Sequence, residues 1–246
     1  GAKDTVRARS VEALRAALAG AREDAPRLVE EMIVGREYSF ETVTLGGEVR
    51  AWSCSRYLPG CLEVLENPWM QWCCMLPRSL EAPVYERAHA MGVAAIRALG
   101  LADGMTHMEW FERDDGTLAI GEIAARPPGP QLFQMTGLVH DVDPHRAWAR
   151  AEIDGAFEGP WVRRHAAGTA FVRGVGHGRV ASVTGVRDTW DAIHPWLVEA
   201  KLPTPGKPKV TSYEGDGYVV VQHEQTEGVM ALLKTIVETL RVRYED

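Results

Sequence analysis

Residues 107–129 read HMEWFERDDGTLAIGEIAARPPG, and the interpretation of the whole chain starts from this stretch. Apolar and aromatic residues flank the dipeptide Asp115-Gly116, which suits a tight type I′ turn between two strands. With a two-residue loop there, Glu109 and Glu122 lie directly opposite each other on one face of a β-hairpin. Facing like charges destabilise a hairpin, so the two carboxylates need either full solvation or a cation between them.

A divalent cation is one explanation for the facing carboxylates. Mg²⁺ in proteins is commonly held by one or two carboxylates and completes its coordination shell with substrate phosphates. Arg126 follows Glu122 by four residues, and a guanidinium beside such a cation would stabilise a phosphoryl group in transfer. The other explanation is an ordinary surface hairpin with solvated acids, and the spacing alone leaves both open.

Two motifs in the chain resemble those of a known enzyme family. Glu109 together with GEIAARPPG (residues 121–129) resembles the metal-binding hairpin of ATP-grasp enzymes, in which one Glu is followed about a dozen residues later by Glu-(Ile/Val)-Asn-x-Arg-x-x-Gly. LVEEMIVGREYS (residues 28–39) resembles the hinge strand of the same family. The motifs occur in the family's order, and the nearest relatives by motif look like carboxylate–amine ligases of the L-amino-acid ligase kind.

The resemblance implies an α+β chain with the ATP-grasp fold, in which two small subdomains sandwich ATP and a β-rich subdomain follows. It divides the chain into part of the small subdomain (residues 1–35), the large subdomain with the Mg-ATP site (36–160) and the C-terminal subdomain (161–246). The sequence does not begin with Met, and ATP-grasp proteins carry a further domain before this point. We therefore expect the C-terminal portion of a longer protein.

The resemblance also assigns the residues that contact the nucleotide. Glu30 or Glu31 accepts a hydrogen bond from the adenine amino group, and the backbone from there through Met32 to Ile33 contacts the edge of the ring. Glu37 matches the acid that binds the ribose hydroxyls. Without the resemblance, the first two acids would be read as solvating groups on an edge strand.

For the phosphates, the resemblance makes Glu109 and Glu122 the ligands of Mg²⁺, which Mn²⁺ can replace, and Arg126 the catalytic residue. One position departs from the family pattern, because Ala124 stands where Asn usually supplies a further metal ligand. A methyl group coordinates nothing, so water must replace that ligand or a second metal is held more weakly. The rigid Pro-rich loop that contains Gly129 is expected to shape a substrate pocket.

Two further residues are candidates for substrate contact. A two-residue hairpin turn at Gly46-Gly47 would place Arg56 opposite Glu37, either as a simple cross-strand salt bridge or as a cleft residue that takes a substrate carboxylate. His107 lies two residues before Glu109 on the same face of its strand. It either touches substrate or phosphate, or is a structural histidine.

The remaining elements follow from hydrophobic periodicity and capping residues. We expect a β-α-β unit near the start, with strands at residues 3–8 and 28–34 around a helix over 11–19 that Ser10 caps, and a loop at 58–67. Further strands are expected at 69–76, 169–173, 179–184, 209–213 and 218–223. Further helices are expected at 83–99, from 131 onward, from 144 to 153 and at 225–242.

Composition limits the classes of partner. The 246 residues are 46% hydrophobic and 25% charged, with a net charge of −7 and no basic run, which argues against nucleic acid or an anionic membrane. No apolar run approaches the roughly 20 residues of a membrane span, and no signal peptide opens the chain. Four cysteines without a Cys-x-x-Cys pair indicate reduced thiols, so we expect a cytoplasmic protein.

The expected function is an ATP-dependent carboxylate–amine ligase that forms an amide through an acyl phosphate and releases ADP and phosphate. Its substrates would be a small carboxylate and an amine, with amino acids the foremost candidates, and a homodimer is one assembly that the resemblance allows. The alternatives are an ATP-grasp carboxylase or purine-synthesis-type ligase, a nucleotide-binding module that has lost catalysis, and a purely structural fragment.

Overall fold

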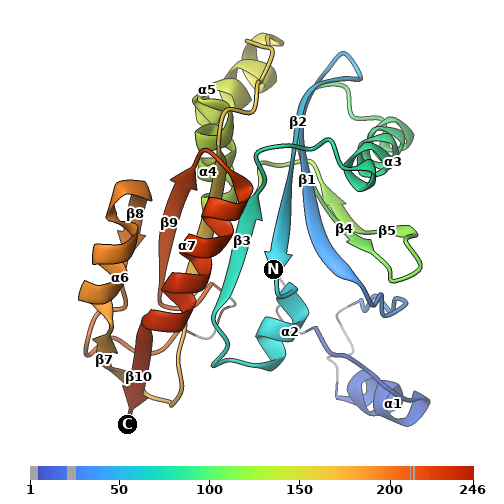
Figure 1. Cartoon of the computed structure of the whole chain (residues 1–246). Helices are drawn as coiled ribbons and strands as arrows, with labels where there is room; N and C mark the ends of the chain where they lie inside the picture. Colours follow the sequence, from blue (N-terminus) through green and yellow to red (C-terminus); the bar gives the residue numbers. More distant parts are fainter. Residues whose placement is uncertain (1–4, 21–25, 211, 213) are drawn as a thin grey trace.

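Two glycines with positive φ, Gly46 and Gly47 (59° and 76°), close the hairpin at the centre of the structure. They join β1 (Arg36–Leu45) to β2 (Glu48–Leu58). The computed structural model describes residues 5–20, 26–210, 212 and 214–246. Within them, the hairpin is part of an eight-stranded antiparallel sheet whose strand order is β5-β4-β1-β2-β3-β6-β9-β8 (Figure 1).

The other strands of this sheet come from both halves of the chain. They are β3 (Trp72–Leu76), β4 (Gly104–Glu112), β5 (Leu118–Ala124), β6 (Ala166–Val172), β8 (Leu197–Lys201) and β9 (Gly217–His223). A second sheet pairs β7 (Arg179–Thr184) with β10 (Arg241–Glu245). The large sheet is therefore continuous across residue 160, where the sequence passes into the expected C-terminal subdomain.

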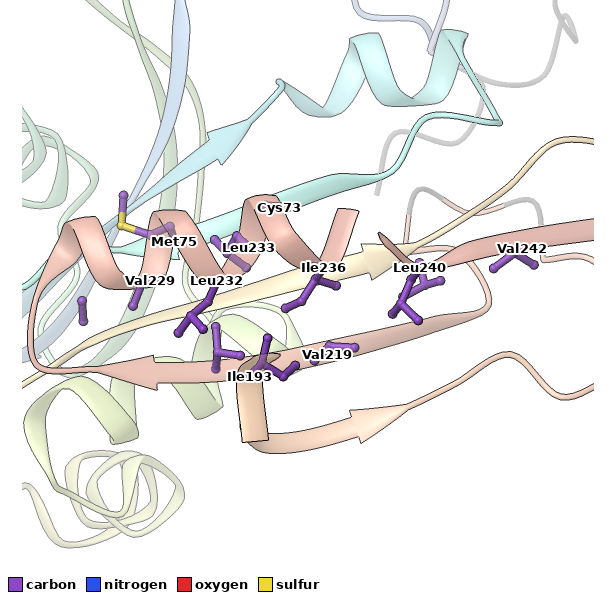
Figure 2. Close-up of a cluster of buried hydrophobic side chains, with 14 of the residues drawn as sticks. Cys73, Met75, Ile193, Val219, Val229, Leu232, Leu233, Ile236, Leu240 and Val242 are labelled. Carbon is purple, nitrogen blue, oxygen red and sulfur yellow. The ribbon is translucent and has the colours of Figure 1, made fainter. Parts of the chain in front are cut away.

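Two helices cover the same face of the large sheet. Residues that pair across neighbouring strands lie on the same face of a sheet. Tyr38 on β1 packs against α3 (Pro83–Leu99) and pairs with Arg56 on β2, which pairs with Met75 on β3. Met75 belongs to the core beneath α7 (Thr226–Thr239). Figure 2 shows α7 lying along the strands with its apolar side chains directed at them, and the predicted stripe is buried: Val229, Leu232, Leu233, Ile236 and Leu240. Near the second sheet, α6 (Val186–Ile193) adds Ile193 to this core, and the 3₁₀ turn η2 (His194–Trp196) follows it.

The opposite face is covered only in part. α4 (Pro130–His140) packs on β3, β6 and β9 through Met135 and Val139. α5 (Pro144–Ala149) and the π-helical turn η1 (Arg150–Asp154) cover the far ends of β1 and β4, where Val43 and Met105 are buried. Between these helices and the edge of the sheet, the same face of β1, β2, β4 and β5 carries polar side chains.

Several predicted helices are confirmed. α1 (Val11–Ala19) begins after Ser10, whose Oγ accepts a hydrogen bond from the backbone N–H of Ala13 at 3.1 Å. α3 has the predicted bounds and ends at Gly100 in the left-handed conformation. Asp143 caps α5 by accepting from two backbone N–H groups. In the described part of the chain, every helix is too short or too polar to span a lipid bilayer.

The predicted β-α-β unit is wrong for the residues that can be checked. Residues 5–8 and 28–34 form no strand, and residues 3 and 4 lie outside the described residues. The apolar side chains of the second segment stay in solvent, with Leu28 81% and Val34 70% exposed. None of the residues of α1 is buried, and α1 stands away from the sheet in Figure 1. A strand requires a hydrogen-bonding partner, and no described strand pairs with either segment.

Three further expectations are corrected. The predicted loop at 58–67 contains a short helix, α2 (Cys61–Glu66), whose Val64 is fully buried. The predicted helix at 225–242 ends at Thr239, because Leu240 is extended and directs the chain into β10. Among the described residues of 209–213 there is no strand.

Gly92 in α3 provides a test of the packing between α3 and the sheet. A Cβ atom there would lie 2.4 Å from Cε1 of Phe40, a ring with no exposed surface. Gly→Ala in a helix interior normally stabilises a protein by about 0.5–1 kcal/mol. We expect Gly92→Ala to lower the free energy of unfolding by about 1–3 kcal/mol instead, measured by chemical denaturation.

A Phe40→Leu background serves as the control for this substitution. The shorter side chain removes the contact, so the penalty of Gly92→Ala should shrink there. An equal penalty in both backgrounds would contradict the packing explanation.

Candidate functional site

The β4–β5 hairpin brings Glu109 and Glu122 opposite each other, as predicted. The loop, however, has three residues, with Gly116 in the left-handed region (φ 79°) and a hydrogen bond from the Arg113 N–H to the Thr117 carbonyl at 2.9 Å. This longer loop would shift the register by one residue. A β-bulge after Glu109, where Gly121 is the extra residue, restores the facing pair.

The two carboxylates differ in their surroundings. Glu109 has 28% of its side chain exposed, and its Oε1 accepts a hydrogen bond from the Tyr57 hydroxyl at 3.5 Å. Glu122 is exposed, and within the described residues no hydrogen bond or ion pair holds its carboxylate. Two hard oxygen donors on directly opposite residues suit a Mg²⁺ ion that also binds phosphates. No group of three or more potential metal ligands forms among the described residues, so the pair would need those phosphates to complete a shell.

His107 lies between the carboxylates of Glu41 and Glu109, two residues before Glu109 on β4. Its Nδ1 is 3.0 Å from Oε1 of Glu41, and its Nε2 is 3.6 Å from Oε1 of Glu109. Burial by itself would lower the pKa of His107, but the bonds to Glu109 and Glu41 outweigh it and raise this pKa to about 9. The imidazole therefore carries a positive charge at neutral pH.

Glu37 is buried, with 7% of its surface exposed. Its Oε2 accepts a hydrogen bond from the backbone N–H of Cys61 at 2.8 Å, at the start of α2. Burial, and next the negative charge of Glu109, raise the pKa of Glu37 to about 7. The residue predicted to bind ribose hydroxyls thus lies on the same face as Glu109, and α2 covers it.

The predicted pairing of Glu37 with Arg56 is wrong. A β-bulge between Val43 and Thr44 shifts the register of the β1–β2 hairpin, so Arg56 faces Tyr38. A shift of one residue moves a side chain to the other face of a sheet. Arg56 therefore lies on the face covered by α3, away from the two facing carboxylates.

The other predicted site residues lie at the edges of this face. Arg126 is exposed, and its Nη1 donates to the carbonyl of Pro127 at 2.9 Å. Gly129 is the N-cap of α4. In the predicted hinge, Glu30, Met32 and Ile33 lie in a segment without regular secondary structure, while Glu31 forms an ion pair with Arg113 at the hairpin tip, at 3.1 Å.

Sequence reasoning missed several polar residues on the same face. Arg163 donates through Nη1 to Ser53 Oγ at 2.8 Å and through Nε to the carbonyl of Pro77 at 2.9 Å. Ser39 and Ser55 share a hydrogen bond across β1 and β2. Glu41 was missed although β1 reads Glu, Ser, Glu at alternate positions, a period-two signal that could have placed all three side chains on one face.

The raised pKa of Glu37 predicts a pH-dependent loss of stability. A carboxyl whose pKa rises on folding from 4.5 to about 7 binds more protons in the folded state, so stability falls as pH rises through this range. Without divalent ions, unfolding free energies from denaturation at pH 5 and pH 8 should show the wild type losing about 2 kcal/mol more than Glu37→Gln. Glu63→Gln, at an exposed position on α2, should keep the wild-type slope, and parallel slopes for wild type and Glu37→Gln would contradict the assignment.

No protein-family profile and no curated protein sequence matches the chain. Solved structures do. An L-amino acid ligase from Bacillus licheniformis has a TM-score of 0.71 at 18% identity, over 87% of this chain and 55% of that one. A phosphoribosylglycinamide synthetase from Anaerococcus prevotii has a TM-score of 0.66 at 14% identity, over 96% and 61%. A carboxyaminoimidazole ribonucleotide synthase from Aspergillus clavatus, complexed with ATP, has a TM-score of 0.55 at 12% identity, over 83% and 50%.

These likenesses concern the fold. The chain spans a little over half the length of the first two structures that it matches. At such low identity they establish the shared architecture, and substrates and activity need separate evidence. The architecture is the one that the two sequence motifs predicted: the chain has the ATP-grasp fold.

Proposed function

We propose that the chain forms the nucleotide-binding and catalytic part of an ATP-dependent carboxylate–amine ligase. The observation that carries the proposal is the facing pair Glu109 and Glu122 on the open half of the sheet, with Arg126 at the end of the same hairpin. The fold shared with a solved L-amino acid ligase and with a synthase complexed with ATP supports it.

In this proposal the chain works by position and charge. Glu109 and Glu122 would hold Mg²⁺, which supplies neutralisation of the β- and γ-phosphates of ATP. A substrate carboxylate oxygen attacks the γ-phosphorus, the bond to the β-phosphate oxygen breaks, and an acyl phosphate and ADP result. An amine then attacks the acyl carbon and expels phosphate, with loss of a proton, to form an amide.

Arg126 supplies the free positive charge of this mechanism. Its guanidinium is exposed, and among the described residues its hydrogen bond is to a backbone carbonyl and no ion pair holds it, so it can turn toward an anionic ligand. There it would stabilise the transferring phosphoryl group and then the tetrahedral oxyanion. No nucleophilic side chain is required.

The nucleoside end of ATP would lie between the hinge, Glu30 to Ile33, and Glu37. Ribose hydroxyls are donors that suit a carboxylate acceptor. One oxygen of Glu37 already accepts from the backbone of Cys61, so ribose binding in this proposal requires α2 to shift at its first turn.

A second candidate is a nucleotide-binding module without turnover. Ala124 favours it, because a methyl group at this position of β5 provides no metal ligand. Such a module would bind nucleotide in a Mg²⁺-dependent way and release no ADP.

The complete encoded protein, incubated with Mg-ATP, pooled amino acids, small carboxylates and hydroxylamine, tests the proposal. Hydroxylamine traps an acyl phosphate as a hydroxamate, so we expect hydroxamate and ADP in equal amounts. Coupled assays measure both products. Formation of AMP in place of ADP would contradict the acyl-phosphate route. Mg²⁺-dependent ATP binding with no turnover in any pool would favour the binding module.

The metal assignment predicts that Glu122→Ala lowers turnover by at least about 10³-fold, since one of two carboxylate ligands is lost. The position is exposed, so the melting temperature should stay within about 2 °C of the wild type. Glu86→Ala, an exposed carboxylate on the sheet's other side in α3, is the matched control and should retain full turnover. ATP turnover that survives Glu122→Ala would overturn the metal assignment.

A further inference from the structure

We propose that the buried pair of Glu41 and His107 positions Glu109, so that one oxygen of its carboxylate is presented to the cation at the proposed Mg-ATP site. This inference rests on the proposed function and names two residues that act through a third. Neither residue would touch substrate.

The register of three strands brings these groups together. Glu41 on β1 pairs with His107 on β4, and the neighbouring pair on the same face is Ser39 with Glu109. On its other side, His107 pairs with Ala124 of β5. Because the alanine side chain has no hydrogen-bonding group, nothing on β5 competes for the imidazole.

Both ring nitrogens of His107 face carboxylate oxygens. Nδ1 lies 3.0 Å from Glu41 Oε1 and Nε2 lies 3.6 Å from Glu109 Oε1. Rotation of the ring would break one contact or both, so Glu41 fixes the ring and the ring restrains Glu109. The Tyr57 hydroxyl donates to the same Oε1 of Glu109. Within the described residues no hydrogen bond or ion pair holds Oε2, which is therefore the oxygen available to a cation.

Glu41 is buried at the edge of a small cavity. Its residue is 5% exposed, and its second oxygen, Oε2, has no hydrogen-bond partner among the described residues. It lines a cavity of about 10 Å³ together with Pro128, Phe133 and Trp161. That volume is about the size needed by one water molecule.

Burial of this pair needs an explanation beyond stability. Replacing a buried ion pair by apolar residues of similar volume is often neutral or stabilising, so the pair is a poor source of folding energy. Residues that orient a metal ligand typically change metal affinity by about 10-fold to 100-fold when they are replaced. The position of the pair beneath Glu109 fits this second role.

The test measures nucleotide affinity as a function of cation. ADP binding to the complete protein is titrated calorimetrically at varied Mg²⁺ and again in EDTA, and Mn²⁺ binding in the presence of ADP is followed by electron paramagnetic resonance. For Glu41→Gln we expect the half-saturating Mg²⁺ and Mn²⁺ concentrations to rise about 10-fold or more. The ADP affinity in EDTA should stay within about twofold of the wild type.

Two further variants keep the test decisive. The double variant Glu41→Leu/His107→Leu leaves no unpaired buried charge, so it should fold even where a single variant does not, and it should show the same loss of cation affinity. Thr106→Val is the matched control. It breaks the buried Thr42–Thr106 hydrogen bond between the same two strands on the opposite face, and it should leave cation affinity unchanged.

The outcomes separate this inference from the proposed function. Normal Mg²⁺-dependent binding in the wild type and unchanged half-saturation in both Glu41 variants would overturn the positioning role alone. An equal loss of cation affinity in Thr106→Val would also overturn it, because any disturbance of the contact between β1 and β4 would then have the same effect. Absence of Mg²⁺-dependent nucleotide binding in the wild type would overturn the proposed function and the positioning role with it.

Discussion

Repulsion between the carboxylates of Glu109 and Glu122 is the constraint around which the open face of the sheet is arranged. The Cβ atoms of directly opposite residues lie about 5 Å apart, and like charges at such a pair destabilise a hairpin, while the imidazole of His107 beside Glu109 offsets part of that cost. A sheet of eight strands tolerates such a cost. In the proposed function, a cation bound between the two groups would remove this repulsion, so the repulsion would favour cation binding.

The two faces of the sheet divide the work of folding and binding. α3 and α7 cover one face with apolar cores, and α4 covers the part of the other face that lies on β3, β6 and β9. The hydrophobic side chains that pack β1, β2 and β4 against α3 lie on one face of these strands, so the other face is free for charged groups. Because the strands are rigid, side chains on that side keep a fixed spacing, which a loop could not guarantee.

Much of the fold could be predicted from periodicity and caps, while site geometry depended on single-residue irregularities. The facing of Glu109 and Glu122 was predicted with a loop one residue too short, and it is correct because the bulge at Gly121 compensates. The β1–β2 hairpin has the predicted two-residue turn, but the bulge between Val43 and Thr44 shifts its register by one residue. Arg56 therefore lies on the opposite face from the one predicted. Local sequence rules do not specify bulges, since these depend on packing between strands.

Glu37 and Glu41 show how position on one strand sets the charge of a buried acid. They share a face of β1, yet Glu41 contacts the imidazole of His107, whereas Glu37 accepts from the backbone N–H and the thiol of Cys61 and is repelled by Glu109. The pKa of Glu37, raised to about 7, leaves its carboxyl close to half protonated at neutral pH. A ligand that donates hydrogen bonds to Glu37 favours its ionised form, so nucleotide binding in the proposed mode must displace α2 and release a proton together.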